Sequence, residues 1–124
     1  MAKILIVDDS ATIRMQLRGC LEPEGHDVTE ADNGAVGLQR AKAGAFDLVI
    51  VDINMPVMSG LEMLEALREV PAARSVPAFV LTTESSKAMV ARGKKCGATA
   101  WIVKPFKPEL LVRGVAHVLS KRAA

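Results

Sequence analysis

Residues 48–64 of the chain read LVIVDINMPVMSGLEML. The four apolar residues 48–51 form a continuous run, which is typical of a strand covered on both faces. The run stops at Asp52, and Ser59 followed by Glu62 forms the S-x-x-E capping box that marks the start of a helix. Leucines at helical spacing continue beyond that cap, at Leu61, Leu64 and Leu67. A buried strand, a loop and a helix in this order predict one βα unit of a parallel sheet.

The same unit recurs along the chain. Apolar runs similar to the one at 48–51 lie at residues 4–7, 78–81 and 101–103. Residues 26–30 are more polar, as in an edge strand. Stretches of helical length and periodicity separate these runs. This alternation predicts βαβ units with right-handed crossovers: an α/β fold with a doubly wound, five-stranded parallel sheet and helices on both faces.

Residues that cap helices support this interpretation. Ser10 and Asn33 stand before two of the predicted helices, where their side chains would serve as N-caps. The fourth helix, roughly residues 86–96, contains Gly93, which costs about 1 kcal/mol relative to alanine in a helix interior. Residues 72–77 are predicted to form a loop.

Length and composition predict a single domain. The 124 residues, 50% of them hydrophobic, suffice for one globular domain over residues 1–124 and leave no room for a separate output domain. No apolar run approaches the roughly 20 residues of a membrane-spanning helix, and no signal peptide is recognisable. The two cysteines and two histidines follow no metal-binding or disulfide-framework spacing. We expect a soluble, cytoplasmic protein with reduced cysteines.

The net charge of +2 conceals an asymmetry along the chain. From Thr82 to the end there are nine Lys or Arg residues and two acids, hence +7, whereas the preceding part has seven against twelve, hence −5. A solvated helix surface and a partner-binding face would both produce such a distribution.

Polar groups follow or end four of the predicted strands: Asp8 and Asp9, Asp52, Thr82, and Lys104. The carboxyl ends of strands in an open parallel sheet face one crevice, so these groups should meet there. Three neighbouring carboxylates repel each other, and a hard cation such as Mg²⁺ relieves that repulsion with oxygen ligands. We predict a Mg²⁺ site, which Mn²⁺ would also occupy, with Asp9 and Asp52 as direct ligands and Asp8 acting through a bound water. The backbone carbonyl of Asn54 is a further candidate ligand.

Asp52 is also the acid best placed to react. A carboxylate attacks phosphorus to form an acyl phosphate when a metal and a cation neutralise the charge on the transferring group. Lys104 would pair with a phosphoryl oxygen opposite the metal, and Thr82 would donate its hydroxyl to another. A capping or solvated role would explain each of these residues alone, but not their joint occurrence at successive strand ends.

Four segments carry a resemblance to a known family: ILIVDDS at 4–10, VIVDINMPVMSGLEML at 49–64, FVLTTES at 79–85 and WIVKPF at 101–106. In this order and spacing they resemble the receiver domain of two-component response regulators, most of all its stand-alone chemotaxis type. The resemblance covers essentially the whole chain. It implies a flavodoxin-like (βα)5 fold with strand order 2-1-3-4-5, which the periodicity alone does not establish.

The resemblance implies a role for each residue of the acidic cluster. Asp52 would be the phosphoacceptor for a histidine kinase or a small phosphodonor, whereas Asp8, Asp9 and the carbonyl of Asn54 would hold Mg²⁺. Lys104 would contact the phosphoryl group, and the peptide bond that follows it would be cis.

The resemblance also implies a conformational switch. Thr82 would move toward the phosphoryl group, and the aromatic side chain at Trp101 would change rotamer with it. Relatives usually carry Tyr or Phe at that position, so the bulkier indole is a departure from the family pattern. Asn54 and Glu84 occupy positions that tune hydrolysis of the acyl phosphate in the family.

A stand-alone receiver acts by binding a target protein, and the resemblance places the binding surface on the fourth helix, the last strand and the last helix. This surface carries six basic residues: Lys87, Arg92, Lys94, Lys95, Lys107 and Arg113. We expect an acidic target whose binding responds to phosphorylation, and a chain that is monomeric or forms a weak phosphorylation-dependent dimer. Direct nucleic-acid binding is disfavoured, because the basic residues have no interleaved aromatics and no recognition-helix motif.

Two other classes of protein fit parts of the pattern. A phosphatase of the haloacid dehalogenase type also uses an aspartate nucleophile, but it needs a second acid two residues later, where this chain has Asn54. We therefore expect no enzymatic activity beyond the chain's own phosphorylation and dephosphorylation. A flavodoxin-like cofactor binder would have a loop rich in Ser, Thr and Gly after its first strand, where this chain has Asp8, Asp9 and Ser10. No nucleotide-binding glycine motif is present either.

Overall fold

The computed structural model describes residues 2–123 of the chain. Within this range the five strands are β1 (Lys3–Val7), β2 (Asp27–Ala31), β3 (Leu48–Val51), β4 (Ala78–Thr82) and β5 (Ala100–Val103). The α-helices are α1 (Ala11–Leu21), α2 (Gly34–Ala43), α3 (Gly60–Leu67), α4 (Lys87–Lys95) and α5 (Pro108–Ala123). Two short 3₁₀ helices also occur, η1 (Glu22–Glu24) and η2 (Pro71–Ala73). The predicted alternation of strands and helices is confirmed.

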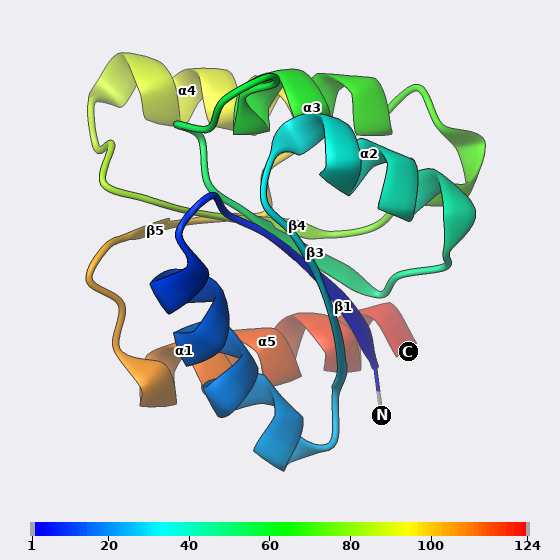
Figure 1. Ribbon diagram of the computed structural model, residues 1–124, viewed down its shortest axis with the longest axis vertical. Coiled ribbons are helices and arrows are strands. Elements are labelled where there is room, and N and C mark those ends of the chain that lie inside the picture. The colour runs from blue at the N-terminus through cyan, green and yellow to red at the C-terminus, as the bar shows by residue number, and fades with distance from the viewer. Residues whose placement is uncertain (1, 124) are drawn as a thin grey trace.

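The described strands form one parallel sheet in the order β2-β1-β3-β4-β5. Helices α2, α3 and α4 cover one face of this sheet, and α1 and α5 cover the other (Figure 1). The chain starts at β1, moves outward to β2, and then returns across β1 to β3, so the strand order reverses beside β1. The expected doubly wound, flavodoxin-like fold is confirmed. In such sheets the carboxyl ends at the reversal point are the usual place for a functional site.

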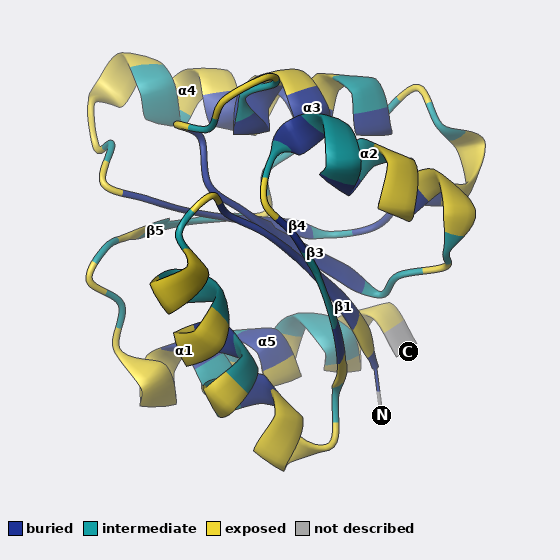
Figure 2. Cartoon of the chain, viewed as in Figure 1, coloured by how far each residue is buried: buried dark blue, intermediate teal, exposed yellow. Residues whose placement is uncertain are grey.

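Alternate residues of the central strands enter two separate cores. Leu5 and Val7 pack toward α2, α3 and α4, whereas Ile4 and Ile6 pack toward α1 and α5. The strands in the middle of the sheet are therefore buried on both faces (Figure 2). Burial on both faces explains why their sequences are continuous apolar runs. The edge strand β2 is only partly buried, which accounts for its more polar sequence.

Helix starts lie where the capping residues predict them. The side chains of Ser10, Asn33 and Ser86 each accept a hydrogen bond from a backbone N–H three residues later, at the starts of α1, α2 and α4. Ser59 and Glu62 form the complete capping box of α3.

Two boundaries differ from the sequence prediction. Residues 72–77 are not entirely a loop, because η2 occupies Pro71–Ala73, and a single 3₁₀ turn is too short to produce a detectable periodicity. The edge strand covers Asp27–Ala31 instead of 26–30, since the His26 N–H turns back to the carbonyl of Leu21. Among the helices of residues 2–123, none has the length and apolar character needed to cross a membrane.

Candidate functional site

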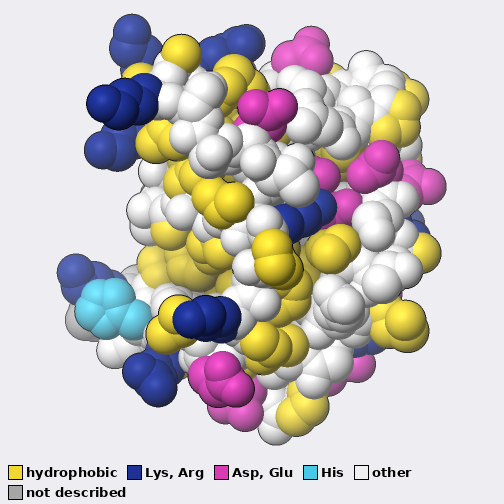
Figure 3. Space-filling model, turned by 90° about the vertical axis from the view of Figure 1, so that its left-hand side faces the viewer, with side chains coloured by type: hydrophobic (Ala, Val, Ile, Leu, Met, Phe, Trp, Pro, Cys, Tyr) yellow, Lys and Arg dark blue, Asp and Glu magenta, His cyan; other side chains and the backbone are white. Residues whose placement is uncertain are grey.

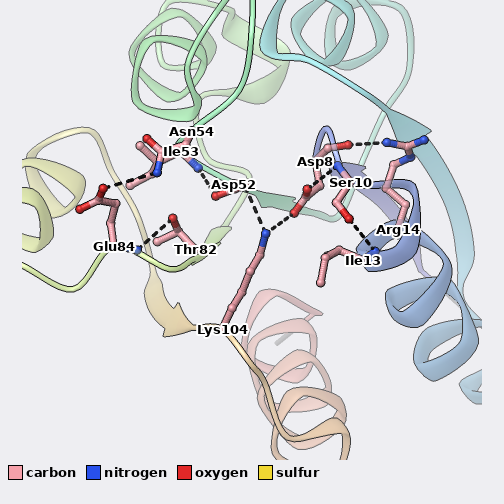
Figure 4. A network of polar contacts seen from close by, with 10 residues as sticks. All are labelled: Asp8, Ser10, Ile13, Arg14, Asp52, Ile53, Asn54, Thr82, Glu84 and Lys104. Carbon is pink, nitrogen blue, oxygen red and sulfur yellow. Dashed lines mark hydrogen bonds and ion pairs between the residues drawn. The ribbon is translucent and has the colours of Figure 1, made fainter.

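Four strand ends meet at one edge of the sheet. Asp8 and Asp52 directly follow β1 and β3, and the last residues of these two strands pair with each other. Thr82 is the last residue of β4, and Lys104 directly follows β5. The side chains of Asp8, Asp52 and Lys104 point toward one another (Figure 4). The parallel topology therefore gathers residues that are up to 96 positions apart in the sequence.

Three carboxylates form the centre of the site. One oxygen from each of Asp8, Asp9 and Asp52 lies within 4.8 Å of the other two. Asp8 and Asp52 are buried, with 2% and 6% of their surface exposed, whereas Asp9 is exposed. Asp8 Oδ1 accepts a hydrogen bond from the Ser10 N–H at 2.9 Å, and Asp52 Oδ1 accepts one from the Ile53 N–H at 2.7 Å. These backbone donors fix the orientation of both buried acids.

Lys104 bridges the two buried acids. Its Nζ donates to Asp8 Oδ2 at 2.9 Å and to Asp52 Oδ2 at 3.2 Å. Burial disfavours the ammonium form, but the hydrogen bond and charge of Asp8, together with those of Asp52, outweigh it and raise the pKa of Lys104. Burial raises the pKa of Asp8, despite the opposing hydrogen bonds from Lys104 and the Ser10 backbone. Lys104 therefore stays charged beside an acid that is easier to protonate than an ordinary aspartate.

Glu84 connects Thr82 with Trp101 and Asn54. The Glu84 backbone N–H donates to Thr82 Oγ1 at 3.3 Å, and the Glu84 carbonyl accepts from Trp101 Nε1 at 2.8 Å. The Glu84 carboxylate accepts from Asn54 Nδ2 at 3.5 Å. One loop residue thus contacts the strand-end hydroxyl, the indole and the side chain of the loop after β3.

The acidic cluster has the donor set that a hard divalent cation requires. All its candidate ligand atoms are carboxylate oxygens, from Asp8, Asp9 and Asp52. Mg²⁺ prefers oxygen ligands, keeps several waters, and takes one or two carboxylates from a protein. Asp9 is exposed, which leaves room for an ion and its waters. The cluster is therefore compatible with Mg²⁺.

Comparison with known proteins decides the family. Residues 4–116 match the family described as "Response regulator receiver domain". The chain belongs to this family. Chemotaxis protein CheY1 of Helicobacter pylori (strain ATCC 700392 / 26695) is 37% identical to it over 119 residues, which cover 94% of this chain and 96% of that protein. Protein PilH of Pseudomonas aeruginosa is 35% identical over 120 residues, which cover 97% of this chain and 99% of that protein.

A solved structure agrees with this assignment. Chemotaxis protein CheY4 of Vibrio cholerae matches the receiver domain with a TM-score of 0.90 and 42% sequence identity, over 95% of this chain and 98% of that chain. As a response regulator receiver domain, the chain functions in two-component phosphorelay signalling.

The basic residues of the receiver domain lie on two sides of an apolar groove. Six exposed side chains are involved: Lys87, Arg92, Lys94 and Lys95 on α4, Lys107 in the loop before α5, and Arg113 on α5. Figure 3 shows one group of Lys and Arg side chains at the upper left and others lower on the same face, with hydrophobic side chains between them. The groove along β5 and α5 measures about 360 Å³, and Val103, Phe106 and Leu110 are among its lining residues. The predicted basic surface therefore also contains an apolar groove, which Lys107 helps to line.

Two residues beside the receiver site were not predicted from the sequence. A Cβ atom at Gly60 would overlap the backbone carbonyl oxygen of Asp52, so glycine is needed for α3 to begin this close to the strand end. Arg14 Nη1 donates to the backbone carbonyl of Asp8 at 2.6 Å. The only local signal for Arg14 is its position one helical turn after the Ser10 cap. For Gly60 the only local signal is its position directly after the Ser59 cap.

Proposed function

We propose that Asp52 is the phosphoacceptor of this receiver domain and that its phosphorylation requires Mg²⁺, which Mn²⁺ can replace. The observation that carries the proposal is the meeting of three carboxylates and Lys104 at one edge of the sheet. Asp52 follows the middle strand of that sheet, so it has Asp8 on one side and Thr82 on the other. Asp8 instead lies between Asp52 and the end of β2, where no hydroxyl or cation of the site is found among residues 2–123.

The same geometry supports different roles in metal binding for the three acids. Asp8 is the least exposed of the three acids, and Lys104 Nζ lies closer to it, at 2.9 Å, than to Asp52, at 3.2 Å, so Asp8 would act on Mg²⁺ through a water. Asp9 and Asp52 would be direct ligands, together with the backbone carbonyl of Asn54.

Phosphorylation would convert the Asp52 carboxylate into an acyl phosphate. One carboxylate oxygen forms a bond to phosphorus while the bond from phosphorus to the leaving group breaks, and the leaving group keeps the bonding electrons. The donor is a phosphohistidine of a histidine kinase or a small acyl phosphate. Bound Mg²⁺ supplies charge neutralisation for the transferring group. Lys104, which its raised pKa keeps protonated, would move from Asp52 to a phosphoryl oxygen, and Thr82 would donate its hydroxyl to another.

The chain would catalyse only its own phosphorylation and the hydrolysis of the acyl phosphate. Asn54 stands two residues after Asp52, and its amide is not a general acid, so steady turnover of phosphate esters is not expected. Asn54 and Glu84 lie 3.5 Å apart through their side chains, and this pair would control how easily water reaches the acyl phosphate.

The output of phosphorylation would appear on α4, β5 and α5. The hydrogen bonds of Glu84 to Thr82 and Trp101 provide a path from the phosphoryl group to β5. The relatives from Helicobacter pylori and Vibrio cholerae are named as chemotaxis proteins, which favours a chemotaxis-like pathway. In the proposed pathway a histidine kinase would be the donor, and a target protein would bind at this face. We include in the proposal a monomer or weak phosphorylation-dependent dimer and a cytoplasmic location, where free thiols such as Cys20 and Cys96 stay reduced.

Labelling with acetyl phosphate tests the acceptor. The native chain should take up one phosphoryl group transiently in the presence of Mg²⁺ and none after chelation. Asp52→Asn keeps the side-chain shape and removes the nucleophile, so labelling should disappear. Label that survives this substitution would move the acceptor to another residue, and sustained release of phosphate from monoesters would favour a phosphatase.

Charge reversal on α4 tests the output surface. The double variant Lys94→Glu and Lys95→Glu should bind the target protein several-fold more weakly, with a weaker dependence on salt, because an attractive rim becomes repulsive. Acetyl phosphate labelling should stay unchanged. The double variant Arg40→Glu and Lys42→Glu on α2 serves as the control, since it makes the same change of charge at exposed residues outside α4, β5 and α5. Unchanged target binding by the double variant would exclude α4 from the interface.

A further inference from the structure

The backbone carbonyl of Asp8 has an unusual hydrogen-bond donor. Asp8 lies one residue beyond the last pairing of β1 with β2, and its N–H still donates to the carbonyl of Ala31 at 3.1 Å. Its own carbonyl accepts from a side chain, Arg14 Nη1, at 2.6 Å (Figure 4). Asp8 is buried, and a buried carbonyl without a donor is costly. Arg14 therefore extends the pairing of β1 by one residue, at the point where the acids begin.

The guanidinium of Arg14 is itself held in place. Arg14 Nε donates to Glu30 Oε1 of β2 at 2.8 Å, and the other oxygen of Glu30 accepts from Arg18 Nε at 2.8 Å. Arg14 and Arg18 are one turn apart on α1, so both face the same strand. Arg18 Nη2 also donates to the carbonyl of Val28 at 3.2 Å. The planar, forked group of Arg14 thus spans from β2 to the end of β1 with little freedom, and 18% of its side chain is exposed.

We propose that Arg14 is a positioning residue for the metal-binding acids. It touches neither the metal nor the phosphoryl group. It holds the backbone of Asp8 in place, and through the next peptide bond it also holds that of Asp9. In this conformation both carboxylates can bind the same ion. This inference rests on the proposed function, since it takes Mg²⁺ as the ion that the acids bind.

The direction in which Mg²⁺ affinity changes when Arg14 is replaced separates a positioning role from a simple charge effect. Arg14 is a cation beside an acidic site, so by charge alone its removal would tighten Mg²⁺ binding, most clearly at low salt. If Arg14 positions the acids, its removal weakens binding. Loss of an outer-shell partner typically lowers metal affinity about 10-fold to 100-fold.

Isothermal titration of the full chain with Mg²⁺ alone makes this test. Arg14→Met keeps most of the side-chain volume and should weaken binding about tenfold, with the same loss at low and high salt. Arg40→Met is the matched control, because Arg40 is an exposed cation that lines the same pocket as Arg14 and Glu30. It should bind Mg²⁺ as well as the native chain or slightly more tightly. Native or tighter binding by Arg14→Met would overturn the proposal.

A milder variant guards against loss of the fold. Urea denaturation without Mg²⁺ shows whether each variant is folded under the titration conditions, since a folded but less stable chain keeps its intrinsic affinity. Arg14→Lys keeps the charge but loses the fork that reaches Asp8 and Glu30 together, so it should bind several-fold more weakly than the native chain. If Arg14→Met does not fold, native affinity in Arg14→Lys would overturn the proposal. Failure of the native chain to take label at Asp52 would instead reject the proposed function.

Discussion

Asp8 is the least exposed of the three site acids, and its burial has a consequence for the dependence of metal binding on pH. Burial raises the pKa of Asp8 above 3.8, its usual value. Mg²⁺ binds the ionised carboxylates, so protons compete with the ion. We predict that Mg²⁺ affinity of the native chain falls as the pH is lowered through the raised pKa of Asp8, at a higher pH than an ordinary aspartate would require.

Titration calorimetry between neutral pH and about pH 4 would measure this fall. The Asp8→Asn variant supplies the control, since its weaker binding should lack the step that belongs to Asp8. An affinity of the native chain that stays constant until the ordinary range of aspartate titration would show that the burial of Asp8 does not govern the site.

At the scale of elements, α4 depends on a contact with β5. Gly93 lowers the helix propensity of α4, yet a Cβ at this position would lie 2.5 Å from Cζ3 and 2.9 Å from Cε3 of Trp101. The indole also donates to the carbonyl of Glu84 at 2.8 Å, in the loop that precedes α4. Gly93 therefore makes room for the indole of Trp101, which links β5 to α4 and to the loop before α4.

The effect of Gly93→Ala should change sign with the residue at position 101. In the native chain the added methyl group must displace the indole, and overpacking of this kind costs about 1–3 kcal/mol. In a Trp101→Ala background the space is open, so Gly93→Ala should stabilise the chain by up to about 1 kcal/mol through helix propensity. Urea denaturation of the four chains completes the cycle. The same sign in both backgrounds would mean that the indole is not what requires glycine at 93.

The same helix shows what sequence reasoning could and could not predict. Apolar runs and N-caps such as Ser10 and Ser59 act within about four residues, so element types followed from local pattern. The carboxyl ends of strands in an open parallel sheet face one crevice, and this depends on topology alone. The sequence therefore predicted that Asp8, Asp52 and Lys104 would meet. Gly93 appeared only as a weak point in a helix, since the atoms that require it belong to another element. Arg14 escaped prediction for the same reason, because its partner is a backbone carbonyl.

At the scale of the whole molecule, the acidic site is a local source of instability. Three carboxylates face one ammonium, so the site carries a surplus of negative charge when no cation is bound. Two unit charges 4 Å apart repel by about 1 kcal/mol even in bulk water. A ligand that binds only the folded chain adds about 2.7 kcal/mol of stability at a hundred times its Kd. Stability of the receiver domain should therefore depend on Mg²⁺ through these few residues.

Asp9→Asn should reduce both the charge repulsion in the empty site and the stability that Mg²⁺ adds. Without Mg²⁺ the variant should be more stable than the native chain by roughly 0.5–1 kcal/mol, because one repelling charge is gone and Asp9 is exposed to screening by solvent. With Mg²⁺ at a concentration that saturates the native chain, the native chain should gain about 2–3 kcal/mol and the variant far less. Urea denaturation with Mg²⁺ and with a chelator measures both differences. Glu69→Gln, an exposed acid near the end of α3, should change neither. If Asp9→Asn kept the full Mg²⁺ increment, the exposed carboxylate would not be a ligand, and the ion would have to be held by the two buried acids and the Asn54 carbonyl.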